Sequence, residues 1–173
     1  GLAIRSNTKV TAALIDNGIN LKVIGRAGIG IDNINIEAAS AKGIVVMNTP
    51  FGNSITTAEH TIAMILSVAR KIPDANNSTH AGNWTNTQYL GTEVTGKTLA
   101  LIGAGNIGSI VASRAIGLKM RVIAYDPFLS SERAKILGIT KVETLPEALG
   151  SSDFVSLHLP KTEKTKNILS KLE

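Results

Sequence analysis

Gly103-Ala104-Gly105-Asn106-Ile107-Gly108 is the stretch that decides the fold, because of the segments on either side of it. The apolar run Thr98–Ile102 before it predicts a strand, and the apolar spacing after it predicts a helix. A second apolar run, Arg121–Tyr125, then ends at Asp126. A strand, a glycine turn, a helix, a second strand and an acid follow one another in the βαβ unit that binds dinucleotides.

Each glycine of this stretch has a predicted physical role. Gly103 allows the tight turn, Gly105 lets the backbone approach a pyrophosphate, and Gly108 lets the helix pack closely on the strand. The free N–H groups and the positive dipole end of the helix would then face the phosphates. We therefore expect residues 98–126 to bind a dinucleotide.

Asp126 indicates which dinucleotide is bound. It lies 18 residues beyond Gly108, where a carboxylate can accept hydrogen bonds from a ribose. The carboxylate would repel a 2′-phosphate, and the following Pro127-Phe128 offers no basic group to receive one. The sequence therefore predicts NAD rather than NADP.

The composition sets outer limits on the fold and on the partners. Of 173 residues, 43% are hydrophobic and only 3% aromatic, which favours buried parallel strands of small aliphatic residues. No apolar run has the length of a membrane span, and the absence of cysteine excludes disulfides and thiolate chemistry, so a cytoplasmic location is expected. The net charge of +5 is scattered along the chain, which favours small anionic ligands over nucleic acid.

Residues 1–48 predict a β-α-β-α-β order and hence a parallel sheet. Gly18 is expected to end the first helix in the left-handed conformation, and Asn7 or Thr8 to cap it. The predicted strands cover Leu2–Ile4, Leu21–Ile24 and Ile44–Met47, and the predicted helices cover Val10–Asp16 and Ile34–Lys42.

Residues 49–95 break this pattern. A capping box at Thr56 and Glu59 predicts the start of a long helix that ends near Ala69. Asn76–Gly91 is predicted to form polar turns, with Trp84 as the one large anchoring side chain.

The α/β pattern resumes after residue 95. Strands are predicted near Leu99–Ile102, Val122–Tyr125, Lys141–Val142 and Phe154–Leu157. A helix is suggested from Lys166 to Glu173. Because a complete dinucleotide fold of this type has six strands, we expect the chain to be a fragment.

A second candidate site follows the strands of residues 1–48. Arg5, Arg26 and Asn48 each come at or after the end of a predicted strand, and parallel strands present these ends together. The glycine-rich loop Gly25–Asp32 can free backbone N–H groups for an anion. A plain glycine turn with a solvated Arg26 is an equally good interpretation of this loop.

The three histidines carry less information. His60 and His80 are interpreted as packed or exposed helix and loop residues, whereas His158 follows a strand at a place that can border a nucleotide. No set of residues has the spacing of metal ligands, so no metal site is expected.

Several motifs together resemble those of the D-isomer-specific 2-hydroxyacid dehydrogenases. They are Arg5-Ser6-x-Thr8-Lys9-Val10, Gly25–Asn33, Asn48-Thr49-Pro50-x-Gly52-Asn53-Ser54, Gly91-Thr92-Glu93, Gly96-Lys97-Thr98, the glycine stretch and Tyr125-Asp126-Pro127. The resemblance implies an α/β protein with part of a flavodoxin-like substrate domain over residues 1–50. A connecting and dimerising helix with its loop would cover residues 51–95, and part of a Rossmann-type NAD-binding domain would cover residues 96–173.

The resemblance also implies roles for individual residues. The substrate, a small anionic 2-hydroxy acid, would be bound by Arg5, Arg26, Ile29, Gly30 and Asn48. NAD would be bound by Ile29, Gly103, Gly105, Asn106, Ile107, Gly108, Asp126, Pro127, His158, Leu159 and Pro160. The family's catalytic arginine, glutamate and histidine would lie beyond Glu173, so no catalytic residue is expected here and the isolated chain is predicted to be inactive. A homodimer or homotetramer would form through the connecting helix and the NAD-binding domain.

Other functions remain open at this point. Arg5 and Arg26 favour a phosphorylated substrate, but a dehydrogenase of glyoxylate, hydroxypyruvate or another unphosphorylated acid carries the same motifs. An NAD-responsive binding protein of the corepressor type uses the same fold without rapid turnover.

Overall fold

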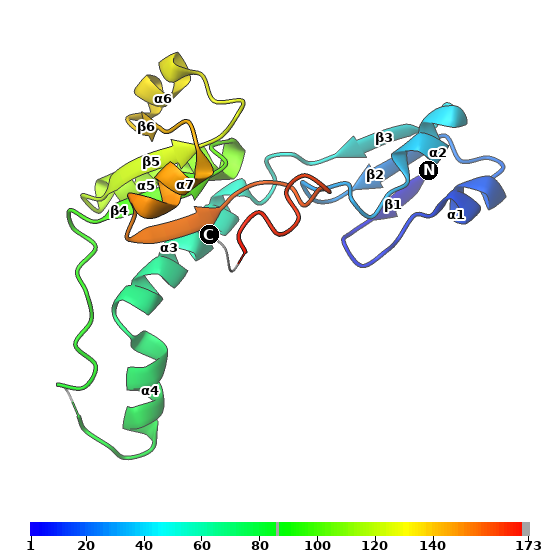
Figure 1. The fold of residues 1–173 in the computed structure, drawn as a ribbon. Coiled ribbons are helices and arrows are strands. Elements are labelled where there is room, and N and C mark those ends of the chain that lie inside the picture. The colour runs from blue at the N-terminus through cyan, green and yellow to red at the C-terminus, as the bar shows by residue number, and fades with distance from the viewer. Residues whose placement is uncertain (86, 171–173) are drawn as a thin grey trace. The chain divides into compact units, whose positions relative to one another are not determined.

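The computed structural model describes residues 1–85 and 87–170, which form two compact α/β units (Figure 1). The first unit holds Gly1–Ser54 and Pro160–Lys166, and the second holds Ile55–Leu159 and residues 167–170. The parallel α/β architecture predicted from the sequence is confirmed in both units. Within the described residues, no helix has the length and apolar character needed to cross a membrane.

The first unit is a three-stranded parallel sheet with helices packed on it. Its elements are β1 (Leu2–Ile4), α1 (Ala12–Asn17), β2 (Val23–Arg26), α2 (Ile36–Ala41) and β3 (Val45–Asn48). The sheet order is β1-β2-β3, so each strand pairs with the next one along the chain. Val10, Ile15 and Ile24 are fully buried and form the centre of its core.

The start and end of α1 differ from the sequence prediction. The helix begins at Ala12, because the side chain of Thr11 caps it by accepting the N–H of Leu14, so the predicted caps Asn7 and Thr8 are wrong. Val10 lies outside the helix, where it pairs with Ile34 in an isolated parallel bridge. Gly18 ends the helix with φ of −83°, so the predicted left-handed conformation is also wrong.

The second unit contains a four-stranded parallel sheet in the order β6-β5-β4-β7. Its strands are β4 (Thr98–Ile102), β5 (Arg121–Tyr125), β6 (Thr140–Lys141) and β7 (Phe154–Leu157). The helices of this part of the chain are α3 (Ser54–Ala69), α4 (Ile72–His80), α5 (Asn106–Gly117), α6 (Ser131–Leu137) and α7 (Leu145–Gly150). The central strand β4 is buried at every residue.

Alternate residues of β4 face two separate apolar clusters. Leu99 and Leu101 pack in one cluster with residues of α3, α5 and α6. Ala100 and Ile102 pack in a second cluster with Ala148 of α7. The sheet is therefore covered on both faces, and the predicted connecting helix α3 shares the core of the second unit through side chains such as Ala58 and Ile65.

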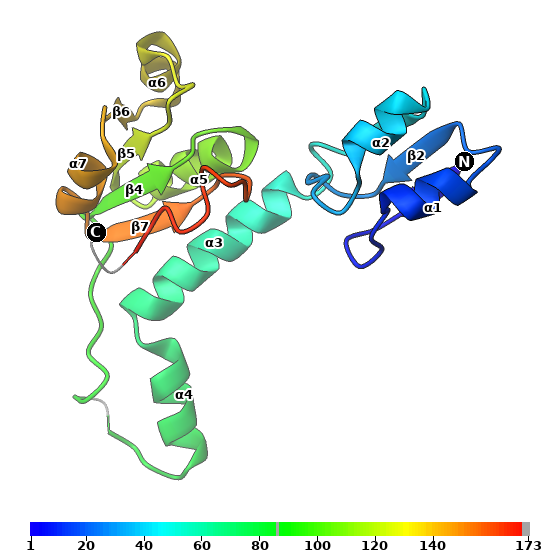
Figure 2. The same ribbon diagram turned by 45° about the vertical axis from the view of Figure 1, so that its right-hand side comes forward.

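The segment between the two sheets holds most of the corrections. Helix α3 begins at Ser54, so Thr56 and Glu59 lie inside it and do not form the predicted capping box at its start. Helix α4 follows α3 (Figure 2) and covers Asn76–His80, where polar turns were predicted. Pro73 occupies the first turn of α4, where a missing N–H breaks no helical hydrogen bond.

The predictions for Trp84 and for a helix from Lys166 are also wrong. Trp84 is 84% exposed and anchors nothing within the described residues of this chain. Residues 166–170 form turns and bends where a helix was suggested, and the rest of that suggestion, 171–173, lies outside the described residues.

Asp153 fastens β7 to the amino end of β4. Its Oδ2 accepts the backbone N–H of Thr98 at 2.8 Å, and its Oδ1 lies 3.4 Å from Nζ of Lys97. The backbone hydrogen bond from Thr98 lowers the pKa of this carboxyl, and Lys97 acts in the same direction. The charged form of Asp153 is therefore the one that stabilises the fold.

We expect Asp153→Asn to lower the unfolding free energy at neutral pH but not in acid. Because the folded pKa is below the ordinary value of 3.8, the stabilisation is complete above that value and is lost as the pH falls through the folded pKa. Urea unfolding of the whole protein at several pH values measures the difference between wild type and variant. Glu163→Gln, at an exposed carboxylate, is the control, and a wild-type advantage that persists at the lowest pH would contradict the assignment.

Candidate functional site

The predicted cofactor residues of the second unit gather at the carboxyl edge of its sheet. The N–H of Gly103 donates to the carbonyl of Tyr125 at 2.9 Å, and the N–H of His158 donates to the carbonyl of Ile102 at 2.8 Å. Gly103, Asp126 and His158 therefore follow three neighbouring strands, with the glycine turn on the central one. This is the edge at which open α/β sheets bind ligands.

The backbone of the glycine turn has the geometry that the sequence predicts. Gly103 has φ of +99°, and a Cβ atom there would lie 2.5 Å from the carbonyl oxygen of His158. A Cβ atom on Gly108 would collide with the carbonyl oxygen of Gly103, so the first turn of α5 packs directly on the end of β4. Around Gly105 a Cβ atom would meet nothing within 4 Å. The backbone is therefore tightly packed at Gly103 and Gly108, whereas the space beside Gly105 is free.

The amino end of α5 can receive an anion. Its N-cap is Gly105, which has no side chain to accept the N–H groups of the first turn. These groups, which include those of Asn106 and Ile107, carry the positive end of the helix dipole. The open space beside Gly105 leaves these N–H groups accessible to a phosphate group.

Asp126 has a structural role that the sequence did not reveal. Its Oδ2 accepts the N–H of Ala104 in the glycine turn at 2.9 Å, and its Oδ1 accepts the N–H of Phe128 at 2.8 Å. The carboxylate therefore ties the end of β5 to the turn after β4. Each oxygen keeps a further lone pair, so the same carboxylate can still accept ribose hydroxyls.

His158 is a half-buried residue whose ring contacts β7, the strand that it follows. Its Nε2 lies 2.9 Å from Oγ of Ser156. Burial lowers the pKa of the imidazole, which favours a neutral ring at neutral pH. Leu159 next to it packs on the Ala100 cluster, whereas Pro160 belongs to the first unit, as does Ile29.

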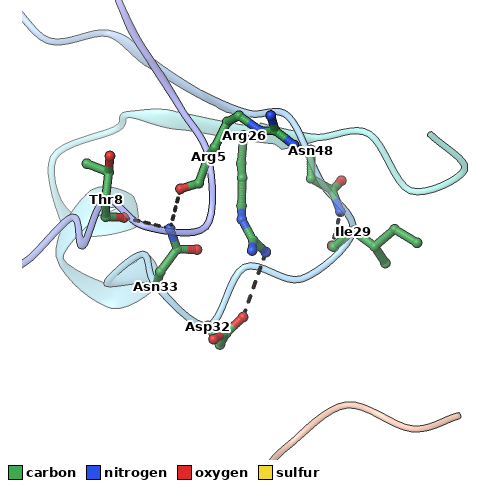
Figure 3. A network of polar contacts seen from close by, with 7 residues as sticks. All are labelled: Arg5, Thr8, Arg26, Ile29, Asp32, Asn33 and Asn48. Carbon is green, nitrogen blue, oxygen red and sulfur yellow. Dashed lines mark hydrogen bonds and ion pairs between the residues drawn. The ribbon is translucent and has the colours of Figure 1, made fainter. Parts of the chain in front are cut away.

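The carboxyl edge of the first sheet brings together the predicted substrate residues (Figure 3). Ile4 is in register with Arg26, and Arg26 is in register with Asn48, so the three strand ends lie side by side. Arg5 follows Ile4 directly. The predicted gathering of Arg5, Arg26 and Asn48 at one edge is confirmed.

Arg26 is a buried arginine. Its side chain is only 10% exposed, which excludes the interpretation as a solvated residue. Its Nη1 lies 3.7 Å from Oδ1 of the exposed Asp32, beyond hydrogen-bond distance, and neither Nε nor Nη1 has a hydrogen-bond partner among the described residues. Buried cationic donors without partners are costly, and an anionic ligand would satisfy them.

The loop after β2 is shaped around this guanidinium. A Cβ atom on Gly30 would lie 2.8 Å from Nη1 of Arg26 and 2.9 Å from Oδ1 of Asp32, so a larger residue there would displace these two side chains. Asn48 donates its Nδ2 to the carbonyl of Ile29 at 2.7 Å, which holds the loop against β3. The carbonyl of Ile29 is therefore engaged, while Gly30 lies beside the unsatisfied arginine.

The remaining two histidines are not among the predicted site residues. His60 and His80 are exposed residues of α3 and α4. Over residues 1–85 and 87–170, no three His, Cys, Asp or Glu side chains come close enough together to hold a metal ion.

Comparison with known proteins places this geometry in a family. Residues 62–173 match the model of the D-isomer specific 2-hydroxyacid dehydrogenase, NAD binding domain. The chain belongs to the D-isomer specific 2-hydroxyacid dehydrogenase family. The matched residues contain the glycine turn, Asp126 and His158, so the second unit is the family's NAD-binding domain and the prediction of NAD as cofactor is confirmed.

Curated members of this family resemble the chain along nearly all of its length. The D-3-phosphoglycerate dehydrogenases of Synechocystis sp. and Bacillus subtilis are 49% and 48% identical to it, over 98% of this chain. The chain spans 30% and 32% of these two relatives. Among solved structures, a D-lactate dehydrogenase from Aquifex aeolicus in complex with NAD and lactic acid superimposes with a TM-score of 0.86. It is 32% identical, and the match covers 94% of this chain and 49% of that one.

We expect Gly108→Ala to weaken NAD binding and to destabilise the protein. The added methyl group would push α5 away from Gly103, and overpacking of this kind typically costs about 1–3 kcal/mol. Gly117→Ala is the matched control, because it lies at the other end of α5 with nothing within 4 Å of its Cβ position. Calorimetric NAD titration and thermal unfolding of the whole protein measure both effects. Equal NAD affinity in the two variants would show that the close packing of Gly108 is not needed.

Proposed function

We propose that the whole protein is an NAD-dependent D-3-phosphoglycerate dehydrogenase that oxidises 3-phosphoglycerate to 3-phosphohydroxypyruvate. The observation that carries the proposal is the identity of 48–49% with proteins of that name across 98% of the chain. The buried Nε and Nη1 of Arg26, which have no hydrogen-bond partner among the described residues, supply a physical reason, since this substrate carries both a phosphate and a carboxylate.

The proposed roles at the first sheet edge concern the substrate. Arg5 and Arg26 bind its phosphate, and the backbone around Ile29 and Gly30 meets its carboxylate. Asn48 lines the same edge and keeps the loop closed through the carbonyl of Ile29. The substrate part of this arrangement is residues 1–50, and residues 51–95 connect it to the NAD-binding part, residues 96–173.

The proposed roles at the second sheet edge concern NAD, which serves as the hydride acceptor when it is bound. The N–H groups of Asn106 and Ile107 bind its pyrophosphate, and Asp126 binds the adenosine ribose. His158 offers a half-buried and neutral ring to the adenine side. The other proposed cofactor contacts are Ile29, Gly103, Gly105, Gly108, Pro127, Leu159 and Pro160.

A second candidate is a dehydrogenase of an unphosphorylated acid. The structural likeness to a D-lactate dehydrogenase, with a TM-score of 0.86, favours it. The two candidates differ in what Arg26 does, because an unphosphorylated acid offers one anionic group where 3-phosphoglycerate offers two.

We expect the whole protein to reduce NAD with 3-phosphoglycerate in preference to D-glycerate and D-lactate, and in the reverse direction to oxidise NADH with 3-phosphohydroxypyruvate in preference to glyoxylate and hydroxypyruvate. Arg26→Lys should raise the KM for 3-phosphoglycerate by about 10-fold or more, the size expected for loss of a hydrogen bond to a charged group. Arg133→Lys, on an exposed face of α6, is the control. Preference for an unphosphorylated acid would support the second candidate, and NAD binding without turnover would overturn both.

We further propose that the protein forms a homodimer, or a homotetramer, through α3 and the segment that follows it. Helix α4 has no buried residue, and several large apolar side chains of residues 64–90 are exposed. These exposed side chains, Met64 and Val68 of α3, Ile72 of α4, and Trp84 and Leu90 of the segment after it, come from three neighbouring parts of the chain. Exposed apolar surface of this kind supports an interface with a second copy of the chain.

We expect Val68→Asp to weaken this assembly, because it places a charge in the proposed apolar interface. Analytical ultracentrifugation of the whole protein over a range of concentrations gives the association constant. Ile136→Asp, at an equally exposed apolar residue of α6, is the control and should leave the assembly unchanged. A wild-type protein that sediments as a monomer would contradict the proposal.

A further inference from the structure

Asn33 connects two loops that are far apart in the sequence. Its Nδ2 donates one hydrogen bond to the carbonyl of Arg5 at 3.0 Å and another to the carbonyl of Thr8 at 2.6 Å (Figure 3). These partners precede it by 28 and 25 residues. One amide group thus holds both ends of the short loop that begins with Arg5.

The backbone of Asn33 is itself fixed to the core of the first unit. Its carbonyl accepts the N–H of Val10 at 2.8 Å, and the carbonyl of Val10 accepts the N–H of Asn35 at 2.9 Å. Val10 is 1% exposed and pairs with the buried Ile34. The side chain of Asn33 therefore extends from a rigid point of the fold to the loop of Arg5.

Asn33 also ends the loop that begins with Arg26. Asp32, which precedes it, is the acidic residue that faces Nη1 of Arg26 at 3.7 Å. The position of Asn33 therefore constrains both loops that carry the arginines of this edge. The loop after β1 and the glycine-rich loop after β2 contain no helix or strand, so side-chain contacts such as those of Asn33 help to hold them in place.

The chemistry of the two contacts requires an amide at this position. Both partners are carbonyl oxygens, so only the NH₂ group of Asn33 can face them. Its Oδ1 is buried without a hydrogen-bond partner among the described residues. An aspartate would set a charged acceptor against two carbonyl oxygens, and an alanine would leave both carbonyls without this donor.

We propose that Asn33 is a positioning residue of the anion site, which holds Arg5 in place relative to Arg26. This inference rests on the proposed function, in which Arg5 and Arg26 bind the phosphate of the substrate. Asn33 touches no substrate in this account and acts only through the loop that carries Arg5.

The test is a kinetic comparison of Asn33→Ala and Asn35→Ala in the whole protein. Asn35 is a matched control, because it is an asparagine of the same unit whose side chain caps α2 by accepting the N–H of Ala38. Asn33→Ala should raise the KM for 3-phosphoglycerate about tenfold with little change in kcat or in NAD affinity, since the displaced Arg5 loses its contact with the substrate. Asn35→Ala should leave the KM unchanged.

A double-mutant cycle with Arg5→Lys separates positioning from general destabilisation. If Asn33 acts through Arg5, the double variant should raise the KM little more than Arg5→Lys alone, whereas independent effects would multiply. Asn33→Ser replaces Asn33→Ala if the alanine variant does not fold. An unchanged KM in the Asn33 variant, or multiplied effects in the cycle, would overturn the proposal.

The same experiment distinguishes this inference from the proposed function. If Arg5→Lys and Arg26→Lys raise the KM for 3-phosphoglycerate but the Asn33 variant does not, only the role of Asn33 is wrong. If neither arginine affects that KM, the phosphate site itself is wrong.

Discussion

Parallel pairing of the strands is the constraint on which both candidate sites depend. It brings the carboxyl ends of neighbouring strands to one edge, so residues far apart in the sequence follow one another across the sheet. In the first unit the register joins Ile4, Arg26 and Asn48, and in the second it sets Gly103 between Asp126 and His158. The apolar clusters around Ile24 and on both faces of β4 keep the strands in these registers. Without them, neither group of side chains would come together.

Polar side chains at these edges shape the backbone as well as offering groups to ligands. Asp126 binds the N–H of Ala104, and Asn48 binds the carbonyl of Ile29, so each fixes the loop beside it. Arg26 differs, because its Nε and Nη1 stay buried without hydrogen-bond partners among the described residues. This contrast supports different roles for these side chains. The Asp126 carboxylate and the Asn48 amide hold the loops in place, and the Arg26 guanidinium is available to an anion.

The sequence predicted the parts of the fold that depend on local pattern. Apolar runs identified the strands, and the glycine spacing identified the closed turn at Gly103 and Gly108. Helix α4 was missed because most of its residues are polar and its Asn and Ser residues are typical of turns, although Pro73 in its first turn was a usable signal. The contacts of Asn33 with Arg5 and Thr8, and that of Asp126 with Ala104, join residues 22 to 28 positions apart, which no local pattern contains.

Calorimetric titration of the whole protein with NAD and with NADP tests the central claim, that the edge formed by Gly103, Asp126 and α5 selects the cofactor. Because Asp126 is held by Ala104 and Phe128, its charge cannot turn away from a 2′-phosphate. We expect NAD to bind at least about tenfold more tightly than NADP, the effect of about 1.4 kcal/mol of charge repulsion. Equal or tighter binding of NADP would contradict the account.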